Sequence, residues 1–461
     1  MSARDPAVLE ASALRDDLAA ALAGCDNDRI LLLHVPAPVA PVEALLASDS
    51  GADGLLWAPP GDPAFAGVGV AVELRGSGEG RFAQVRAAGE ALWRRLAHRA
   101  LPGVEAPPTR LVGGFAFQPG VAGTRPWESF GEATFRLPRF GYARKGDAAT
   151  LTLALGPDDR GDAERHLADL EAHLAALAGT AAGHCHARAA SRILSRTTVE
   201  PAPWRSLIRS IREGIREGRF EKVVAARRLE LEVDPAPDAV AVLRAFSEVE
   251  PACTRFALRR GRATFLGATP ERLLRKRGDS LETEALAGTI RPGGPRNASR
   301  LLASGKDHHE HELVVRDLLR CLGPIARSLE YSGQPTVQSL RHALHLRTPV
   351  TATLREPHHV LDLVERLHPT PAVGGVPTRA ALEWIAAHEP DGRGWYAAPF
   401  GWFDESGDGE FVVALRSGVI EGRRVHLYAG AGIVADSDAD AEYAETQLKL
   451  SALLDALALG E

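Results

Sequence analysis

The stretch GKDHHEHEL, residues 305–313, contains three histidines and three acidic residues within six consecutive positions. It begins a longer helical pattern that continues as ELVVRDLLRCL. On a helix, Asp307 and Glu310 are three residues apart and share one face, while His308 and His311 form a second pair on an adjacent face. The HExxH spacing of zinc proteases is absent. The stretch is therefore either a solvated charged face of a helix or part of a metal site.

The last predicted helix of the chain carries a second pair of carboxylates. In DADAEYAETQLKL, residues 438–450, Glu442 and Glu445 are three apart and Lys449 follows one turn later. Such pairs repel each other unless they are solvated or share a cation. Because all of these ligand atoms are oxygens, the cation favoured is a hard one, Mg²⁺ above all, with the histidines as neighbours. Acidic residues at helix starts are also ordinary caps, so both interpretations stay open.

Length and composition exclude several classes of protein. A chain of 461 residues with 45% apolar and 25% charged residues can form two or three domains, or one large α/β domain. The net charge of −6 gives no polybasic signature, so we expect neither nucleic acid nor an anionic membrane as a partner. No apolar run resembles a signal peptide or a membrane span, and the four cysteines form no CxxC pair. These features predict a cytoplasmic protein with free thiols.

The order of the predicted elements favours α+β layering, because strands and helices alternate without a strict βαβ repeat. Short strands in the first 180 residues precede a small, polar segment at 179–203, which we interpret as a connector. Further strands follow it, up to a final glycine-rich one. Helices are predicted at 161–178, 204–218, 299–328, 378–387 and 439–459.

Three shorter motifs are weak when each is taken alone. Gly430, Gly432 and Ala435 form a GxGxxA pattern, but no helix follows at once, so a dinucleotide site is not expected. Backbone N–H groups beside such small residues can still receive a carboxylate. Lys222, at the head of the apolar strand KVVAARRLELE, is either an exposed edge residue or a base in a closed site. Glu271, in GATPERLL, follows a proline turn and by itself is an acid at a helix start.

Taken together, these segments resemble the chorismate-utilising enzymes, which include isochorismate, salicylate, anthranilate and aminodeoxychorismate synthases. The resemblance covers about residues 200–455 and holds in the order of the family's motifs. It rests on EKVVAARR, GATPERLL, EALAGTIRP, SGKDHHEHELVV, LHPTPAVGGVP, GWYAAPFGW, VVALRSG, YAGAGIV and EYAETQLKL. The resemblance implies a large layered α/β sandwich of the α+β class, with antiparallel or mixed sheets and helices packed outside. Residues 1–185 would be an α/β region integrated into this fold, and residues 186–461 the chorismate-binding catalytic region.

The resemblance also implies a reaction and a role for each site residue. In this family a nucleophile adds at C2 of chorismate while the C4 hydroxyl leaves. Lys222 falls at the position of the general base in the water-using members, and Glu271 at that of the general acid. The Mg²⁺ site that anchors the ring carboxylate falls on Glu310, Glu442, Glu445 and Asp307. Asp307 has the shorter arm where glutamate also occurs in the family, which suggests a water-mediated or outer ligand.

Nine further positions match substrate contacts of the family. Tyr396 and Arg416 correspond to the pair that grips the enolpyruvyl carboxylate, which an arginine can do bidentately. The complete set comprises Gly288, Thr289, His345, Ala372, Tyr396, Arg416, Gly430, Gly432 and Lys449.

Single positions separate the members of the family. Lys222 stands where the ammonia-using enzymes usually have glutamine, so the nucleophile is expected to be water. Ala287 replaces the covalent lysine of aminodeoxychorismate synthases. Ala372 is typical of isochorismate synthases, whereas salicylate synthases, which go on to eliminate pyruvate, tend to have threonine there. We therefore expect an Mg²⁺-dependent isochorismate synthase, most similar to the menaquinone-pathway type.

Some alternatives remain open at this point. A siderophore-pathway isochorismate synthase, a salicylate synthase and a catalytically silent chorismate-binding relative share most of these motifs. No amidotransferase motif is visible, so we expect a monomer that takes chorismate as its substrate, without a glutamine amidotransferase subunit.

Overall fold

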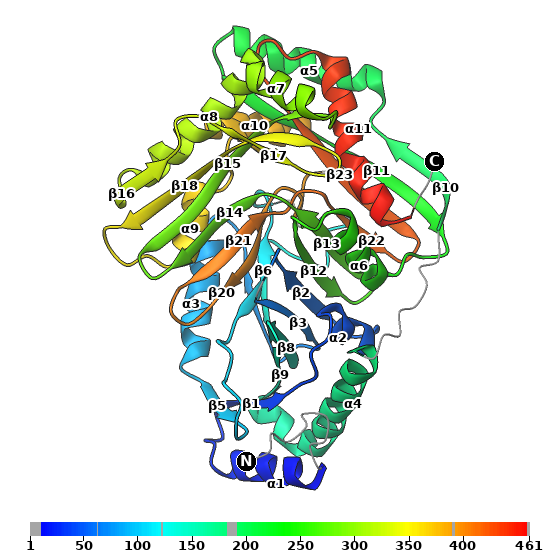
Figure 1. Cartoon of the computed structure of the whole chain (residues 1–461), viewed down its shortest axis with the longest axis vertical. Coiled ribbons are helices and arrows are strands. Elements are labelled where there is room, and N and C mark those ends of the chain that lie inside the picture. The colour runs from blue at the N-terminus through cyan, green and yellow to red at the C-terminus, as the bar shows by residue number, and fades with distance from the viewer. Residues whose placement is uncertain (1–10, 62, 121–122, 182–190, 390–391, 459–461) are drawn as a thin grey trace.

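The computed structural model describes residues 11–61, 63–120, 123–181, 191–389 and 392–458 (Figure 1). Within these residues the strands form two large sheets. Strand pairs in both sheets are antiparallel except for β1 with β5, which is parallel. Helices pack around the sheets, so the predicted α+β layering with mixed sheets and outer helices is confirmed.

The first sheet has 13 strands and draws on both halves of the chain. In sheet order they are β10 (Arg192–Thr198), β11 (Lys222–Asp234), β23 (Arg424–Ile433), β22 (Ser417–Glu421), β13 (Ala263–Thr269), β12 (Thr254–Arg260), β2 (Gly54–Ala58), β3 (Ala64–Val68), β8 (Phe140–Lys145), β9 (Ala148–Leu155), β1 (Ile30–Pro36) and β5 (Leu96–Ala100), with β19 (Gly375–Val376) paired to β11.

The second sheet has 10 strands and also combines strands from both halves of the chain. In sheet order they are β16 (Ala326–Tyr331), β18 (Leu344–Leu354), β15 (Ser280–Ile290), β14 (Arg272–Arg277), β21 (Gly409–Val413), β20 (Pro399–Phe403), β6 (Leu111–Phe115), β7 (Ala133–Leu137) and β4 (Val72–Gly76), with β17 (Thr336–Ser339) paired to β18.

The helices divide between the two sheets. Those that contact the first sheet, or one another beside it, are α1 (Ala11–Ala23), α2 (Glu43–Ser48), α4 (Ala163–Ala181), α5 (Pro201–Arg216), α6 (Ala239–Val249), α10 (Thr378–His388) and α11 (Ala439–Ala456). Those that contact the second sheet are α3 (Arg81–Trp93), α7 (Pro295–Ala303), α8 (Gly305–Leu322) and α9 (Val360–Leu367). A short 3₁₀ helix spans Pro157–Asp162. Among the described residues no helix is both long and apolar enough to cross a bilayer.

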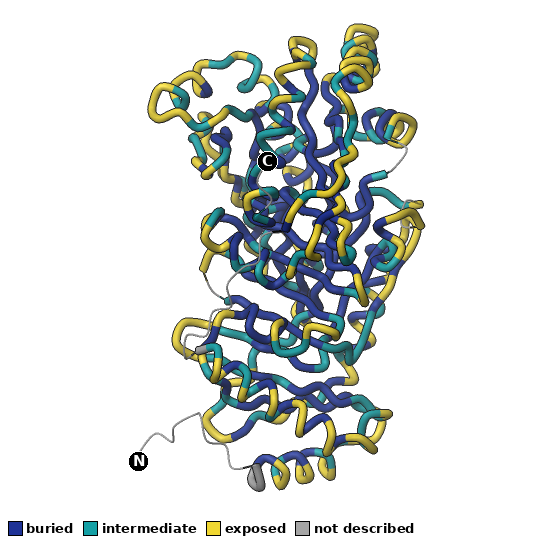
Figure 2. Tube along the Cα trace, turned by 90° about the vertical axis from the view of Figure 1, so that its right-hand side faces the viewer, coloured by how far each residue is buried: buried dark blue, intermediate teal, exposed yellow. Residues whose placement is uncertain are grey.

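Hydrophobic periodicity explains why these segments fold as they do. In β18 the buried positions 346, 348, 350, 352 and 354 alternate with more exposed ones, which is the period of a strand. In α9, Val360, Val364 and Leu367 recur at the spacing of one helix face. The sheets consequently form a buried interior, while exposed positions lie mainly on helices and connections (Figure 2).

Two cores result. One cluster joins the facing parts of both sheets and includes Trp57, Phe115, Trp395 and Phe411. The other lies on the opposite face of the first sheet and includes side chains from α1, α2, α4, α6 and α11. Strands before and after residue 200 thus share sheets and cores. The predicted boundary between 185 and 186 lies outside the described residues.

Two details differ from the sequence-based expectations. The single helix predicted at 299–328 is wrong: it is interrupted at Ser304, which ends α7 and caps α8, its hydroxyl accepting from the Asp307 backbone N–H at 3.3 Å. Gly323 and Pro324 then end α8, and 326–331 form strand β16. The predicted connector also contains an edge strand, β10, whose mostly exposed residues pair with β11 and lack the alternation that would reveal a strand.

Candidate active site

A cavity that is partly open to solvent lies where the two sheets and helix α8 meet. The walls contain all nine residues predicted to contact substrate, together with Glu271 and Glu310. These side chains come from separate parts of the chain, between residues 271 and 449. The structure therefore brings the predicted substrate residues together.

Lys222 begins β11 and is completely buried, so its interpretation as an exposed edge residue is wrong. The strand places it opposite Val376 of β19, which covers the edge of the sheet at that point. Its Nζ lies 2.9 Å from Oε1 of Glu310, a member of the cavity wall. A buried amine in contact with a carboxylate of the cavity wall is suitably placed for proton transfer.

Glu310 projects from the first turns of α8 toward the cavity. Burial raises the pKa of its carboxyl, but the nearby ammonium groups of Lys222 and Lys306 outweigh burial and hold the pKa below its usual value. Glu310 is thus a carboxylate at neutral pH. It is not part of a solvated helix face, because its side chain is only 12% exposed.

Glycine at position 432 makes room for this ion pair. A Cβ added to Gly432 would stand 2.2 Å from Oε1 of Glu310 and 2.8 Å from Cε of Lys222. Both distances are far below van der Waals contact, so the pair would have to move. The close approach of β23 to the ion pair therefore depends on the absence of a side chain at this position.

We expect Gly432→Ala to lower kcat/KM by about 100-fold, because displacement of a reacting group by a fraction of an ångström to 1 Å costs that order. Steady-state kinetics with chorismate measure the effect. Gly161→Ala is the matched control, since an added Cβ there meets nothing within 4 Å. Equal kinetics in the two variants would show that the ion pair tolerates displacement.

Glu271 lies between Pro270 and β14 and is 4% exposed. It does not begin a helix, contrary to its local interpretation, because the chain runs directly into a strand. Burial, and then the neighbouring Glu284 carboxylate, raise the pKa of Glu271 to about 8, although Lys222 and Lys449 act in the opposite direction. A carboxyl group that keeps its proton at neutral pH can donate it, which suits a general acid.

Arg416 is held in the cavity by a buried polar network. Its Nη1 lies 3.3 Å from Oε1 of Glu250, and its Nη2 lies 3.2 Å from Nε2 of His345. Burial, followed by the Arg416 charge, lowers the pKa of His345 well below its usual value, so the imidazole is neutral. Because a guanidinium can only donate, Nε2 of His345 accepts and Nδ1 carries the proton toward Thr289 Oγ1 and the Gly288 carbonyl, at 3.1 and 3.3 Å.

Tyr396 and Lys449 complete the polar part of the wall. The Tyr396 ring stacks on Tyr428 with centroids 5.3 Å apart, and burial raises the pKa of its hydroxyl to about 12, so it remains a donor. Lys449 donates to the Gly430 carbonyl at 2.9 Å and forms an ion pair with Glu445 at 2.8 Å. The cavity thus presents two cationic side chains, Arg416 and Lys449, to whatever occupies it.

The four predicted metal ligands lie near one another on two helices. Asp307 and Glu310 belong to α8, while Glu442 and Glu445 belong to α11. Burial, and next the charge of Glu445, raise the pKa of Glu442 to about 7. Burial likewise raises the pKa of Asp307, with Glu310 and Glu445 acting in the same direction. The carboxylates therefore repel one another, as the sequence pattern predicts for a pair of helices that share a cation.

Three of the four carboxylates form ion pairs with lysines in the structure. Lys306 lies 2.5 Å from Glu442, and Lys222 and Lys449 hold Glu310 and Glu445. In the part of the chain that the structure describes, no group of three or more His, Cys, Asp or Glu side chains is arranged to hold a metal ion. The oxygen-only donor set and the mutual repulsion still fit a hard divalent cation in their chemistry. Ligation requires Glu442 and Glu445 to turn away from their lysines.

Sequence reasoning missed three residues that shape this site. Lys306 precedes Asp307 directly, so its position in the charged stretch was a usable signal. Glu250 holds Arg416, and Glu284 raises the pKa of Glu271. Neither glutamate lies at a spacing from a motif that would have indicated its role, because the packing of distant segments brings it to the site.

The histidines of the charged stretch have structural partners. His311 is buried and its Nε2 lies 2.8 Å from the Thr348 hydroxyl, while burial lowers its pKa to about 4. His308 bonds the Leu302 carbonyl at 2.8 Å. Both rings help to pack α8 in place.

A layered fold with this cavity is that of the enzymes that bind chorismate. The chain belongs to the chorismate binding enzyme family, which it matches over residues 21–458. The predicted resemblance, the fold type and the prediction of an enzyme are thereby confirmed.

Comparison with individual proteins shows which members of the family this chain is similar to. The chain is 39% identical over 425 residues to the salicylate biosynthesis isochorismate synthase of Pseudomonas aeruginosa, which covers 87% of this chain and 84% of the relative. It is 35% identical to isochorismate synthase MenF of Bacillus subtilis over 75% of this chain and 74% of the relative. Among solved structures, MenF, the menaquinone-specific isochorismate synthase of Escherichia coli, matches with a TM-score of 0.77 at 27% identity, covering 96% of this chain and 100% of that one.

Proposed function

We propose that this protein is an isochorismate synthase, which converts chorismate to isochorismate by adding water at C2 as the C4 hydroxyl leaves. The observation that carries the proposal is that Glu271 and Glu310 line one cavity, with the buried Lys222 directly behind Glu310 at 2.9 Å. Lys222 is a buried amine paired with Glu310, and Glu271 is a carboxyl group whose raised pKa keeps it protonated. A binding protein has no need of a base and an acid at the same small cavity.

The charges of the cavity suit a substrate with two carboxylates. Arg416 and Lys449 supply fixed positive charge, and Arg416 is oriented by Glu250 and His345. The neutral His345 adds no charge of its own but restricts the guanidinium to one direction. We assign the enolpyruvyl carboxylate to Arg416 and Tyr396, since an arginine presents parallel N–H donors to a carboxylate.

The environments of Lys222 and Glu271 suggest which of them accepts a proton and which donates one. Lys222 removes a proton from the water that attacks C2, and Glu271 gives its proton to the departing C4 hydroxyl. Each such transfer typically contributes about 10²–10⁴-fold to the rate. Apolar side chains, among them Val224, Leu286 and Ala372, also line the cavity.

We propose Mg²⁺ as the cofactor, held by Glu310, Glu442 and Glu445, with Asp307 as an outer ligand through water. A bound Mg²⁺ would supply positive charge for the ring carboxylate and for charge that develops in the transition state. The support is the crowding of four carboxyl groups on α8 and α11, in which burial and Glu445 raise the pKa of Glu442, and burial, Glu310 and Glu445 raise that of Asp307.

We expect chelation by EDTA to remove activity and added Mg²⁺ to restore it. The reason is that the carboxylates of Glu310, Glu442 and Glu445 would repel the ring carboxylate of chorismate unless a cation stood between them. The measurement is isochorismate formation before and after metal addition. As a control, Glu442→Gln should raise the Mg²⁺ concentration needed for half-maximal rate, whereas Glu312→Gln, on the same helix as Asp307 but exposed, should leave it unchanged. Full activity in excess EDTA would remove the metal from the account.

Product analysis separates the proposal from its alternatives. The purified protein is incubated with chorismate and Mg²⁺, and the products are separated by chromatography. Isochorismate alone supports the proposal. Salicylate with pyruvate would identify a salicylate synthase, anthranilate in the presence of ammonium an amine-using enzyme, and unchanged chorismate a silent relative.

A further inference from the structure

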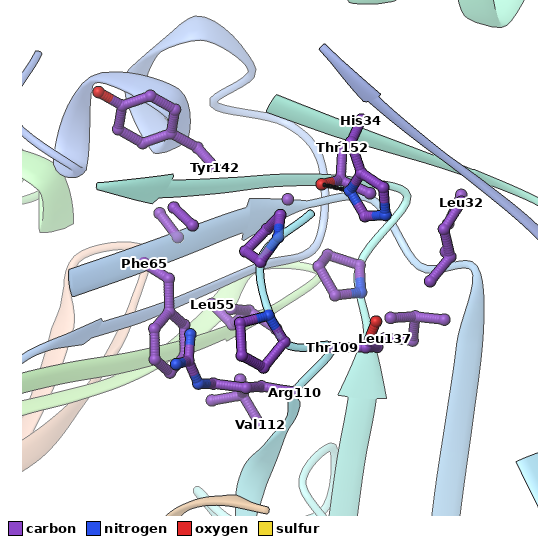
Figure 3. A pocket seen from close by; sticks show the side chains of 17 residues that line it. Leu32, His34, Leu55, Phe65, Thr109, Arg110, Val112, Leu137, Tyr142 and Thr152 are labelled. Atoms are coloured by element: carbon purple, nitrogen blue, oxygen red, sulfur yellow. Dashed lines mark hydrogen bonds between the residues drawn. The ribbon is translucent and has the colours of Figure 1, made fainter. Parts of the chain in front are cut away.

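A second pocket lies far along the sheets from the active site and uses a different set of strands. Its space of about 540 Å³, partly open to solvent, is lined by residues of β1, β2, β3, β6, β7, β8 and β9 and of the segment 107–110 (Figure 3). Its apolar walls come from Leu32, Leu55, Phe65, Val112 and Leu137. It shares no lining residue with the active-site cavity.

Among the described residues that line this pocket, Arg110 is the one charged side chain if His34, which also lines it, is neutral. His34 meets that condition, because burial and the adjacent His98 lower its pKa to about 4. Both ring nitrogens of His34 are also engaged, with Thr152 at 2.9 Å and with His98 at 3.0 Å. His34 is therefore a neutral, satisfied part of the wall.

The Arg110 guanidinium contacts two aromatic rings. Its Cζ is 5.0 Å from the centroid of Phe65, which Figure 3 shows beside it, and 4.6 Å from the centroid of Trp402. Burial, followed by Arg277, lowers its pKa to about 10, so the group remains charged at neutral pH. Its Nε is buried without a hydrogen-bond partner, which is costly for a charged donor. The ring contacts stabilise the charge but leave this Nε–H without a hydrogen-bond partner.

We propose that this pocket is a binding site for a small aromatic monocarboxylate, whose carboxylate pairs with Arg110 and whose ring contacts Leu55, Val112 and the proline cover. A single cation in an apolar cavity matches a ligand with one negative charge and an apolar body. The active site differs in this respect, since it offers two cationic side chains for a dicarboxylate. The proposal is independent of the reaction assigned above.

The first experiment uses the unmodified protein and trans-cinnamate as the probe. Isothermal titration calorimetry is expected to show saturable binding of trans-cinnamate, and binding about tenfold weaker or more for cinnamamide, which has the same shape without the charge. Absence of binding by trans-cinnamate, or equal binding of the acid and the amide, overturns the proposal. This comparison needs no variant and is therefore not affected by folding defects.

The second experiment locates the site with a matched pair of arginine variants. Arg110→Met keeps the length of the side chain, and we expect it to weaken trans-cinnamate binding about tenfold or more. Arg277→Met is the control, because that guanidinium stacks on the same Trp402 ring at 4.7 Å but does not line the pocket. Binding should also persist in Arg416→Ala. Loss of binding in Arg416→Ala, or full affinity in Arg110→Met, would assign the probe to the active site or elsewhere and refute the proposal.

Discussion

Replacing Glu271 with glutamine is expected to lower kcat by about 10²–10⁴-fold, because the amide fills the same space but has no proton to give to the leaving hydroxyl. The side chain is buried and bears its proton at neutral pH, so the substitution removes neither a charge nor an ion pair. The fold should therefore be unaffected. Steady-state kinetics on chorismate, with thermal unfolding as a check, make the measurement.

The pH dependence provides a sharper test of the same role. The acid works only when protonated, and its pKa is raised to about 8, so kcat/KM should fall as the pH rises through about 8. That alkaline limb should be absent from the residual activity of Glu271→Gln. Glu410→Gln is the matched control, since Glu410 is equally buried but pairs with Arg272 and Arg275 outside the cavity. A Glu271→Gln enzyme that keeps the unmodified rate and limb refutes the assignment of the acid.

Replacing Lys222 with glutamine is the second large effect that we expect, again about 10²–10⁴-fold in kcat. The amide can still donate to Glu310, which would otherwise be a buried carboxylate without its closest partner, but it cannot accept a proton from water. This choice separates loss of the base from loss of the ion pair.

The control for this variant is Lys276→Gln. Lys276 is also a buried lysine that pairs with a carboxylate, Asp408, at 2.6 Å, but Asp408 does not line the cavity, whereas Glu310, the partner of Lys222, does. Replacement of Lys276 should lower stability without changing kcat. If Lys222→Gln and Lys276→Gln retained the same kcat, Lys222 would not be the base.

The sequence was informative where the family's motifs are dense. The nine substrate positions all line one cavity. The motifs that contain these side chains also form the strands β15, β18 and β23, which position them. The pairing of Glu310 and Glu442 with lysines was not predictable in the same way. Lys306 meets Glu442 because α8 and α11 converge, and Lys222 meets Glu310 because β11 and α8 do, whereas the Lys449–Glu445 pair is an i,i+4 spacing within α11.

Local patterns misled where packing decides the outcome. The local pattern indicates an exposed edge residue at Lys222, but β19 covers this position. The pattern through residue 304 indicates one continuous helix, but Ser304 caps a new helix. The pocket at Arg110 had no signal at all. Its walls come from seven strands and a proline-rich segment, and most of the residues are apolar and individually ordinary.

The most direct test of the central claim follows the oxygen atom. Chorismate and Mg²⁺ are incubated with the enzyme in H₂¹⁸O, and the isochorismate formed is examined by mass spectrometry. If Lys222 activates water for attack at C2 while Glu271 releases the C4 hydroxyl, the product carries one ¹⁸O atom, located at C2. Isochorismate without the label would show that the hydroxyl migrates within the substrate, and the roles given to Lys222 and Glu271 would be contradicted.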